Sequence, residues 1–253
     1  MHLNFKSFGE RIPVVILHGL LGSLDNWQTF ARRLSSEFKV YTVDQRNHGK
    51  SPHSEVHTYS AMVSDLIEFF DEHHIDQAHL IGHSMGGKVA MQFAISHSAR
   101  VLKLILVDIS PRSYESGHDV IFEALMQIDL SKIKKREEAE VMLSEKIHDA
   151  AVRRFLLKNL DRVESGFVWK MNLDGFYRNY ENINVPIQSD SEIDIPTILI
   201  RGAKSNYVQE SDLKTFREIF PSTKLVTIPN AGHWVHADAP DKFYEVVKKE
   251  LSL

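Results

Sequence analysis

Six short apolar runs, separated by helical patterns, constrain the fold of this chain more than any other feature. The runs are rich in Val, Ile and Leu and do not alternate with polar residues, which is typical of parallel strands covered on both faces. Strand–helix alternation of this kind predicts an α/β protein with a doubly wound, mostly parallel sheet. The six runs are Ile12–Leu17, Phe38–Val43, Ala78–Gly82, Leu102–Val107, Pro196–Ile200 and Lys224–Ile228.

One interval, residues 111–189, interrupts this alternation. It holds charged helical patterns such as "DVIFEALMQI" and "KKREEAEVMLSEKI", and then "FVWKMNL", whose apolar residues alternate at the period of a strand. We interpret it as a helical cap inserted into a core formed by residues 1–110 and 190–253. The alternative is that these segments are the outer helices of a larger α/β domain.

Composition and charge exclude several classes of function. The formal net charge is -4 and there is no basic block, so nucleic-acid binding has no electrostatic support. The chain contains no Cys, which excludes disulfides, thiol catalysis and thiolate metal sites. No apolar segment approaches the length of a transmembrane helix, and the one near the N-terminus is too short for a signal peptide. We therefore expect a cytoplasmic protein that does not bind membranes.

The stretch "GHSMGGK" fits two different motifs. From Gly82 to Lys88 it matches most of a phosphate-binding P-loop, but that loop needs Ser or Thr after the lysine, and Val89 cannot ligate a metal ion. From Gly82 to Gly86 it reads G-x-S-x-G, the nucleophile elbow, in which a serine sits on a sharp turn between a strand and a helix. The buried strand before it favours the elbow, with Ser84 as nucleophile.

Two further segments supply partners for this serine. "LHGLLGS" follows the first strand, and a turn there can aim the Leu20 amide, together with that of Met85, at a developing oxyanion. We expect the side chain of His18 to do no more than support the turn. "PNAGHWVHADAP" follows the last strand and offers His233 as the general base, with His236 as its rival.

Together, "HGLLGS", "GHSMGG" and "AGHWVHADAP" resemble the α/β-hydrolase fold superfamily over nearly the whole chain. Further motifs, among them "DQRNHGKSPH", "VDISP" and "WKMNL", are similar to those of the YbfF-like esterases and the abhydrolase-domain-containing protein 11 group. This resemblance implies the fold and a hydrolytic activity through a Ser-His-Asp triad. It does not identify the substrate.

The acid of such a triad is less obvious than the nucleophile. In most members of the superfamily it follows the strand written here as "PTILIRG", but Ser205 stands where that aspartate is expected. The resemblance implies Asp108, in "LILVDISP", as the acid, and Ser205 as an accessory group that bonds His233 or Asp108. Asp212 and Glu210 remain alternatives.

The interpretation is a serine esterase acting on small-molecule carboxylic esters or acyl thioesters with a hydrophobic acyl group. Such catalysis needs no cofactor and no metal, and we interpret "DEHHID" (Asp71–Asp76) as the polar end of a helix. Alternatives on the same fold are a lipase, a carbon–carbon bond hydrolase, a cofactor-free peroxidase or a non-catalytic binding protein. The sequence gives no oligomeric state.

Overall fold

The central feature of the computed structural model, which describes residues 1–114 and 117–252, is a seven-stranded sheet in the order β1-β3-β2-β4-β5-β8-β9. Neighbouring strands from β3 to β9 pair in parallel, and β1 pairs antiparallel with β3 at the edge. The strands are β1 (Phe5–Phe8), β2 (Pro13–Leu17), β3 (Lys39–Val43), β4 (Ala78–His83), β5 (Val101–Val107), β8 (Thr197–Gly202) and β9 (Lys224–Ile228).

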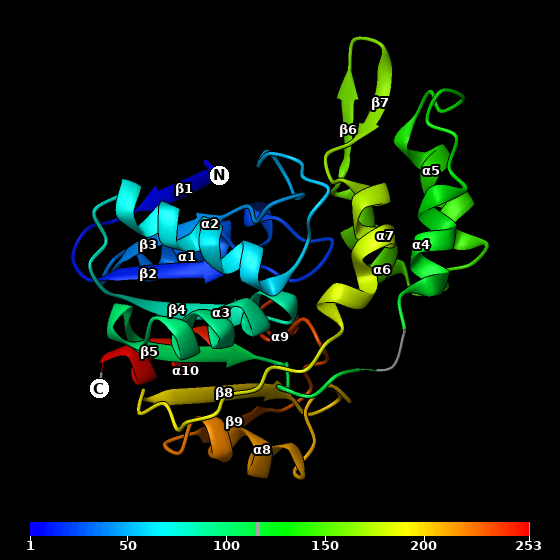
Figure 1. Cartoon of the computed structure of the whole chain (residues 1–253). Helices are drawn as coiled ribbons and strands as arrows, with labels where there is room; N and C mark the ends of the chain where they lie inside the picture. Colours follow the sequence, from blue (N-terminus) through cyan, green and yellow to red (C-terminus); the bar gives the residue numbers. More distant parts are fainter. Residues whose placement is uncertain (115–116, 253) are drawn as a thin grey trace.

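The six apolar runs of the sequence are confirmed as the six parallel strands. Every residue of β4 is buried, because helices cover both faces of the sheet (Figure 1). The edge strand β1 was not predicted: its sequence, FKSF, is short and none of its residues is buried. A short, half-exposed strand gives no run of apolar residues for sequence analysis to detect.

The helices divide into two layers around the sheet. Apolar side chains of α2, α3 and α8 pack on one face, and those of α1 and α10 pack on the other. None of the helices in the described residues is both long and apolar enough to cross a membrane. The helices outside the cap are α1 (Gln28–Leu34), α2 (Tyr59–Glu72), α3 (Met85–Ser96), α8 (Asp212–Ile219), α9 (Val235–Asp238) and α10 (Pro240–Ser252), with 3-10 turns η1 (Leu24–Asn26) and η2 (Ser98–Arg100).

Between β5 and β8 the chain forms helices and a hairpin that lie at the carboxyl ends of the parallel strands (Figure 1), and we keep the name cap for this predicted insertion. That edge is where open α/β sheets bind ligands. The predicted limits of the insertion, residues 111 and 189, fall in the loops that leave β5 and return to β8. The cap contains α4 (Asp119–Met126), α5 (Arg136–Ser144), α6 (Ala150–Leu157), β6 (Leu160–Val163), β7 (Gly166–Trp169) and α7 (Leu173–Ile183).

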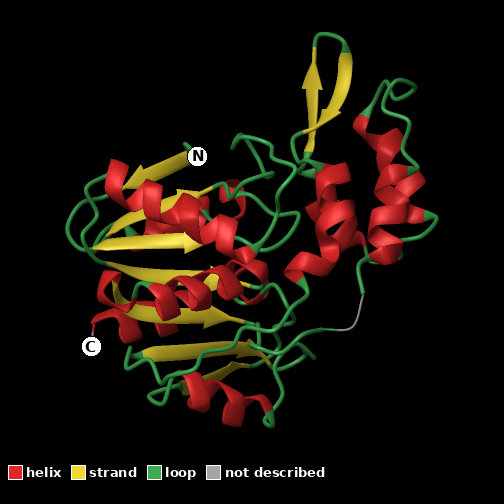
Figure 2. Ribbon diagram, in the orientation of Figure 1, coloured by secondary structure: helices red, strands yellow, loops and turns green. Residues whose placement is uncertain are grey.

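The alternating segment "FVWKMNL" is a strand only in its first part. Its first residues belong to β7, which pairs antiparallel with β6 in a hairpin that projects away from the cap helices (Figure 2). The strand ends at Trp169, and Leu173 already begins α7. The Asn172 side chain accepts a hydrogen bond from the Gly175 amide and so caps that helix.

Hydrogen bonds fasten the cap to the core, and one ties its two ends together. The Asn172 amide donates to the Asn47 carbonyl of the core at 2.9 Å, and the Ile187 amide donates to the Pro111 carbonyl at 2.7 Å, between the two ends of the cap. The Asn159 side chain donates to the Leu21 carbonyl at 2.7 Å, beside the turn after β2. The cap is therefore held directly over the loops that follow the strands.

Candidate active site

Ser84 stands between β4 and α3 with a backbone that L-residues rarely adopt, φ 53° and ψ -122°. Such a conformation costs about 1–3 kcal/mol and persists only where its surroundings impose it. Close packing imposes it here. A Cβ added to Gly82 would lie 2.4 Å from the Gly86 carbonyl oxygen, and one added to Gly86 would lie 2.4 Å from the Leu17 carbonyl oxygen. This is the geometry of a nucleophile elbow.

Hydrogen bonds hold the elbow at the end of the sheet. The Ser84 amide donates to the Val107 carbonyl of β5 at 3.1 Å, and the Ser84 carbonyl accepts from the Gly87 amide at 2.8 Å. The serine side chain is thus fixed at the carboxyl edge of the sheet, under the cap.

Asp108 follows β5 directly and is completely buried. It also has a positive φ of 50° and donates its amide to the Ile200 carbonyl at 2.8 Å. Its carboxylate accepts a hydrogen bond from the Gly202 amide on Oδ1 at 3.1 Å and one from the Ser205 hydroxyl on Oδ2. Ser205 therefore lies against Asp108 and shares its carboxylate with the Gly202 amide.

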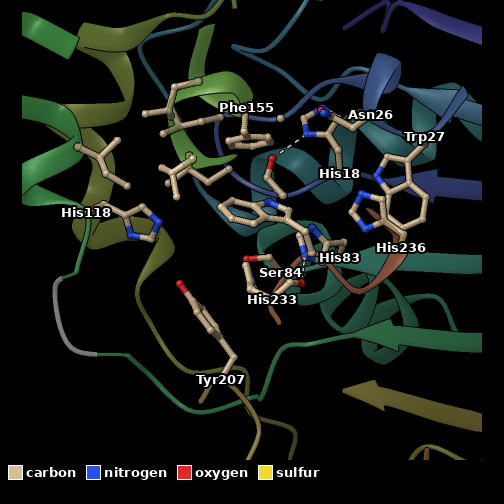
Figure 3. Close-up of a pocket in the computed structure, with 18 of the residues that line it drawn as sticks. His18, Asn26, Trp27, His83, Ser84, His118, Phe155, Tyr207, His233 and His236 are labelled. Carbon is tan, nitrogen blue, oxygen red and sulfur yellow. Dashed lines mark hydrogen bonds between the residues drawn. The ribbon is translucent and has the colours of Figure 1, made fainter. Parts of the chain in front are cut away.

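His233 lies within 2.8 Å of Asp108, measured from Nδ1 to Oδ2. A buried carboxylate accepts, so Nδ1 carries the proton and Nε2 is free to accept one. The imidazole is also stacked on Tyr207, with ring centroids 3.8 Å apart and an interplanar angle of 22°. Figure 3 shows His233 next to Ser84, with His118 from the cap on the opposite side from Trp27 and His236.

The backbone amides expected to bind an oxyanion, those of Leu20 and Met85, belong to residues that line a cavity together with Ser84. Met85 is the first residue of α3, so its amide has no partner four residues earlier in the helix. The turn that carries Leu20 is braced by the buried ring of His18. Its Nδ1 donates to the Gly19 carbonyl at 2.8 Å, and its Nε2 accepts from the Gln45 amide at 3.1 Å.

Two further histidines lie close to His233, but neither takes its place as the base. Burial lowers the pKa of His83 well below its usual value, and its Nε2 donates to the His233 carbonyl at 2.9 Å. His236 is stacked on Trp27 with ring centroids 4.0 Å apart, and burial lowers its pKa to about 3. Within the described residues, Asp108 bonds His233 and makes no bond to the rival His236.

The alternative acids are engaged elsewhere. Asp212 forms an ion pair with Arg112 at 3.2 Å and accepts the Gln209 amide at 2.8 Å. Glu210 forms an ion pair with Arg201. Each of these carboxylates is therefore bonded to a residue other than His233. In the part of the chain that the structure describes, no group of His, Asp or Glu side chains is arranged to hold a metal ion.

Two cavities meet at Ser84. The first, about 210 Å³, is mostly apolar and includes His233, Trp27, Phe155 and Trp234 in its wall. The second, about 380 Å³, is lined by tyrosines, Asn184, Asn206, Lys88 and Arg112. Sequence analysis missed His118 and Tyr207, which line both cavities, because no motif surrounds either residue.

The chain is similar to known hydrolases over almost its whole length. The α/β hydrolase fold family matches residues 12–130. The sn-1-specific diacylglycerol lipase ABHD11 of Danio rerio is 39% identical over 248 residues, which cover 94% of this chain and 78% of the relative. Esterase YbfF of Escherichia coli (strain K12) is 36% identical over 241 residues, covering 95% and 93%. A solved structure, "Marine microorganism esterase", superimposes with a TM-score of 0.96 at 42% identity, covering 98% of both chains.

This chain therefore belongs to the α/β-hydrolase fold family. Within it, the chain falls in the group of YbfF-like esterases and abhydrolase-domain-containing protein 11, and it is a carboxylic ester hydrolase. The resemblance inferred from the sequence motifs is confirmed, as is the fold class.

Proposed function

We propose that this enzyme is a serine esterase that cleaves small-molecule acyl esters through a covalent acyl-enzyme on Ser84. His233 takes the proton of the Ser84 hydroxyl as it attacks the ester carbonyl, and returns that proton to the leaving alcohol. Asp108 holds the His233 tautomer and stabilises the imidazolium. The single observation that carries the proposal is the 2.8 Å bond from His233 to buried Asp108, beside the strained Ser84.

The amides of Leu20 and Met85 would stabilise the oxyanion of each tetrahedral intermediate. Losing one such donor typically costs about 10²–10³ in rate. Water then enters, gives a proton to His233, and attacks the acyl-enzyme, which releases the acid and restores Ser84. The same steps serve an acyl thioester, whose thiolate leaves more readily than an alkoxide.

Ser205 would act through Asp108 rather than on the substrate. Its hydroxyl donates to the same Oδ2 that accepts from His233. A second donor on this oxygen fixes the direction of the carboxylate, and a charge-assisted hydrogen bond is stronger than a neutral one. We propose it as a positioning residue in place of the aspartate that most of the superfamily carries there.

The test is hydrolysis of p-nitrophenyl esters of increasing acyl length by the wild type and by Ser84→Ala, with an acyl thioester in parallel. Ser36→Ala is the matched control, because Ser36 is exposed in the loop between α1 and β3, at the amino end of that strand. We expect turnover to vanish in Ser84→Ala and to persist in Ser36→Ala. Turnover that survives Ser84→Ala would mean that another residue is the nucleophile, and no turnover of any ester or thioester would favour a binding protein.

A further inference from the structure

Lys88 is a buried lysine on the first turns of α3, and the catalytic steps described above do not use it. The residue is only 2% exposed. Its ammonium donates a hydrogen bond to the Val185 carbonyl at 2.7 Å. Among the described residues, no carboxylate lies within 4 Å of Nζ, although 18 ion pairs occur elsewhere. A buried charge without a counter-charge is costly, so an anion bound beside Lys88 would offset part of that cost.

Lys88 lines the second cavity together with Ser84. Lys88 follows Ser84 by four residues, so the two lie on one face of α3, about one helical turn or ~5 Å apart along the axis. Long side chains on a helix lean toward its N-terminus, which brings Nζ back toward the serine. Nζ lies 5.2 Å from the ring centroid of Tyr114 and 5.9 Å from that of Tyr59. The site is therefore positive, partly aromatic and close to the nucleophile.

Arg112, the other cation that lines this cavity, is less available than Lys88 to bind an anion. The Arg112 guanidinium is already paired with Asp212 at 3.2 Å and lies 4.3 Å from the Tyr114 ring centroid. Its charge is thus partly neutralised by the protein. Burial, with a smaller effect of Arg112, lowers the pKa of Lys88 to about 8. An anion bound in the cavity would offset this unfavourable burial.

The position of the base decides which half of the ester enters which cavity. The leaving oxygen must lie beside His233, which lines the first cavity and not the second. The acyl group, which stays on Ser84, then extends the other way, past Met85 and toward Lys88. The first cavity would therefore hold the alcohol, and the second, which Lys88 lines, the acyl group. This differs from the hydrophobic acyl group expected from the sequence.

We propose that the acyl group of the preferred substrate ends in a carboxylate, which Lys88 binds in the second cavity. The inference rests on the proposed esterase function and names the class of its substrate. Because Ser84 and Lys88 line one cavity from adjacent turns of the chain, the probe we choose is a short dicarboxylate half-ester, in which two or three carbons separate the carboxylate from the reacting carbonyl.

The experiment compares two esters that differ only in charge. In monoethyl succinate a carboxylate ends the acyl group, and in ethyl 4-methylpentanoate an isopropyl group of similar shape replaces it. We would measure kcat/KM for both at pH 7 in a pH-stat, for wild type, Lys88→Met and Lys88→Arg. The ratio of the two values cancels any general loss of activity. Lys146→Met is the matched control, because Lys146 lies in the cap and pairs with Glu123 outside both cavities.

We expect the charged-to-neutral ratio to fall at least about tenfold in Lys88→Met, the effect of losing a hydrogen bond to a charged group, and to recover in part in Lys88→Arg. The control should keep the wild-type ratio. An unchanged ratio in Lys88→Met, with a lower melting temperature, would overturn the proposal, because Lys88 would then only fasten the Val185 segment.

A second pair of esters carries the charge on the alcohol half: 3-(butanoyloxy)propanoate and 3-methylbutyl butanoate. If Lys88→Met lowers this ratio instead of the first, the acyl assignment is wrong. If Lys88→Met does not fold, the wild type decides: a kcat/KM for monoethyl succinate at or above that for the neutral ester supports the proposal, and a lower value contradicts it. Neutral-ester turnover in wild type and Ser84→Ala tests the esterase function separately.

Discussion

Replacing Asp108 by Asn should disable the enzyme while leaving its shape unchanged. One carboxylate oxygen of Asp108 accepts from His233 and Ser205, and the other accepts from the Gly202 amide. An amide has one oxygen and one NH₂ group, so either orientation sets its NH₂ against a donor. Keeping the Gly202 bond turns the NH₂ toward His233 and favours the tautomer with its proton on Nε2, which cannot accept the serine proton. We expect kcat to fall by about 10⁴, or ~5.5 kcal/mol of activation free energy.

The assay is p-nitrophenyl ester hydrolysis under saturating substrate, with circular dichroism and a melting curve to show that the variant is folded. Asp212→Asn is the matched control, because this rival carboxylate is bound to Arg112 and to the Gln209 amide. We expect the control to lose less than tenfold. Asp108→Asn that keeps more than a tenth of wild-type kcat, or Asp212→Asn that loses about 10⁴, would refute the assignment of the acid.

Three other variants test neighbouring parts of the structure. Ser205→Ala removes one hydrogen-bond donor to Asp108 and should lower kcat about tenfold in the same assay. An unchanged kcat would contradict the positioning role of Ser205. Gly82→Ala would set a Cβ 2.4 Å from the Gly86 carbonyl oxygen, so we expect the free energy of unfolding, measured in urea, to fall by about 1–3 kcal/mol. No fall would show that the elbow relaxes freely. Burial lowers the pKa of His79 to about 4, so below pH 6.5 the unfolded chain binds a proton that the folded chain does not, and stability falls toward pH 4. Between pH 7 and pH 5 the wild type should therefore lose about 2 kcal/mol more unfolding free energy than His79→Leu, and equal losses would show that His79 is not the cause.

The sequence predicted the parallel sheet because burial on both faces forces long apolar residues into each strand. β4 is the clearest example, with all six residues buried. The same logic fails where a strand is not covered. β1 lies at the sheet edge and β6 has three exposed residues of four, so neither has an apolar run. In "FVWKMNL" the strand stops at Trp169 and a helix capped by Asn172 begins at Leu173, although the apolar alternation runs on to Leu173.

The candidate site was predictable where its residues sit in motifs at strand ends. Ser84, Asp108 and His233 each follow a strand or lie in the loop after one, and parallel strands bring those points to one edge of the sheet. His118 and Tyr207 were not predictable in this way. They reach the site only through the packing of the cap and of the loop after β8, which no local pattern encodes.

The most direct test of the central claim is covalent labelling of the nucleophile. The enzyme would be incubated with a reactive alkyl phosphonate ester, and the adduct located by intact mass and peptide mapping while residual esterase activity is followed. The account predicts one adduct per chain, on Ser84, formed in step with the loss of activity and absent from Ser84→Ala. An enzyme that keeps its activity when Ser84 is fully labelled, or that carries the adduct on another residue as activity is lost, would contradict it.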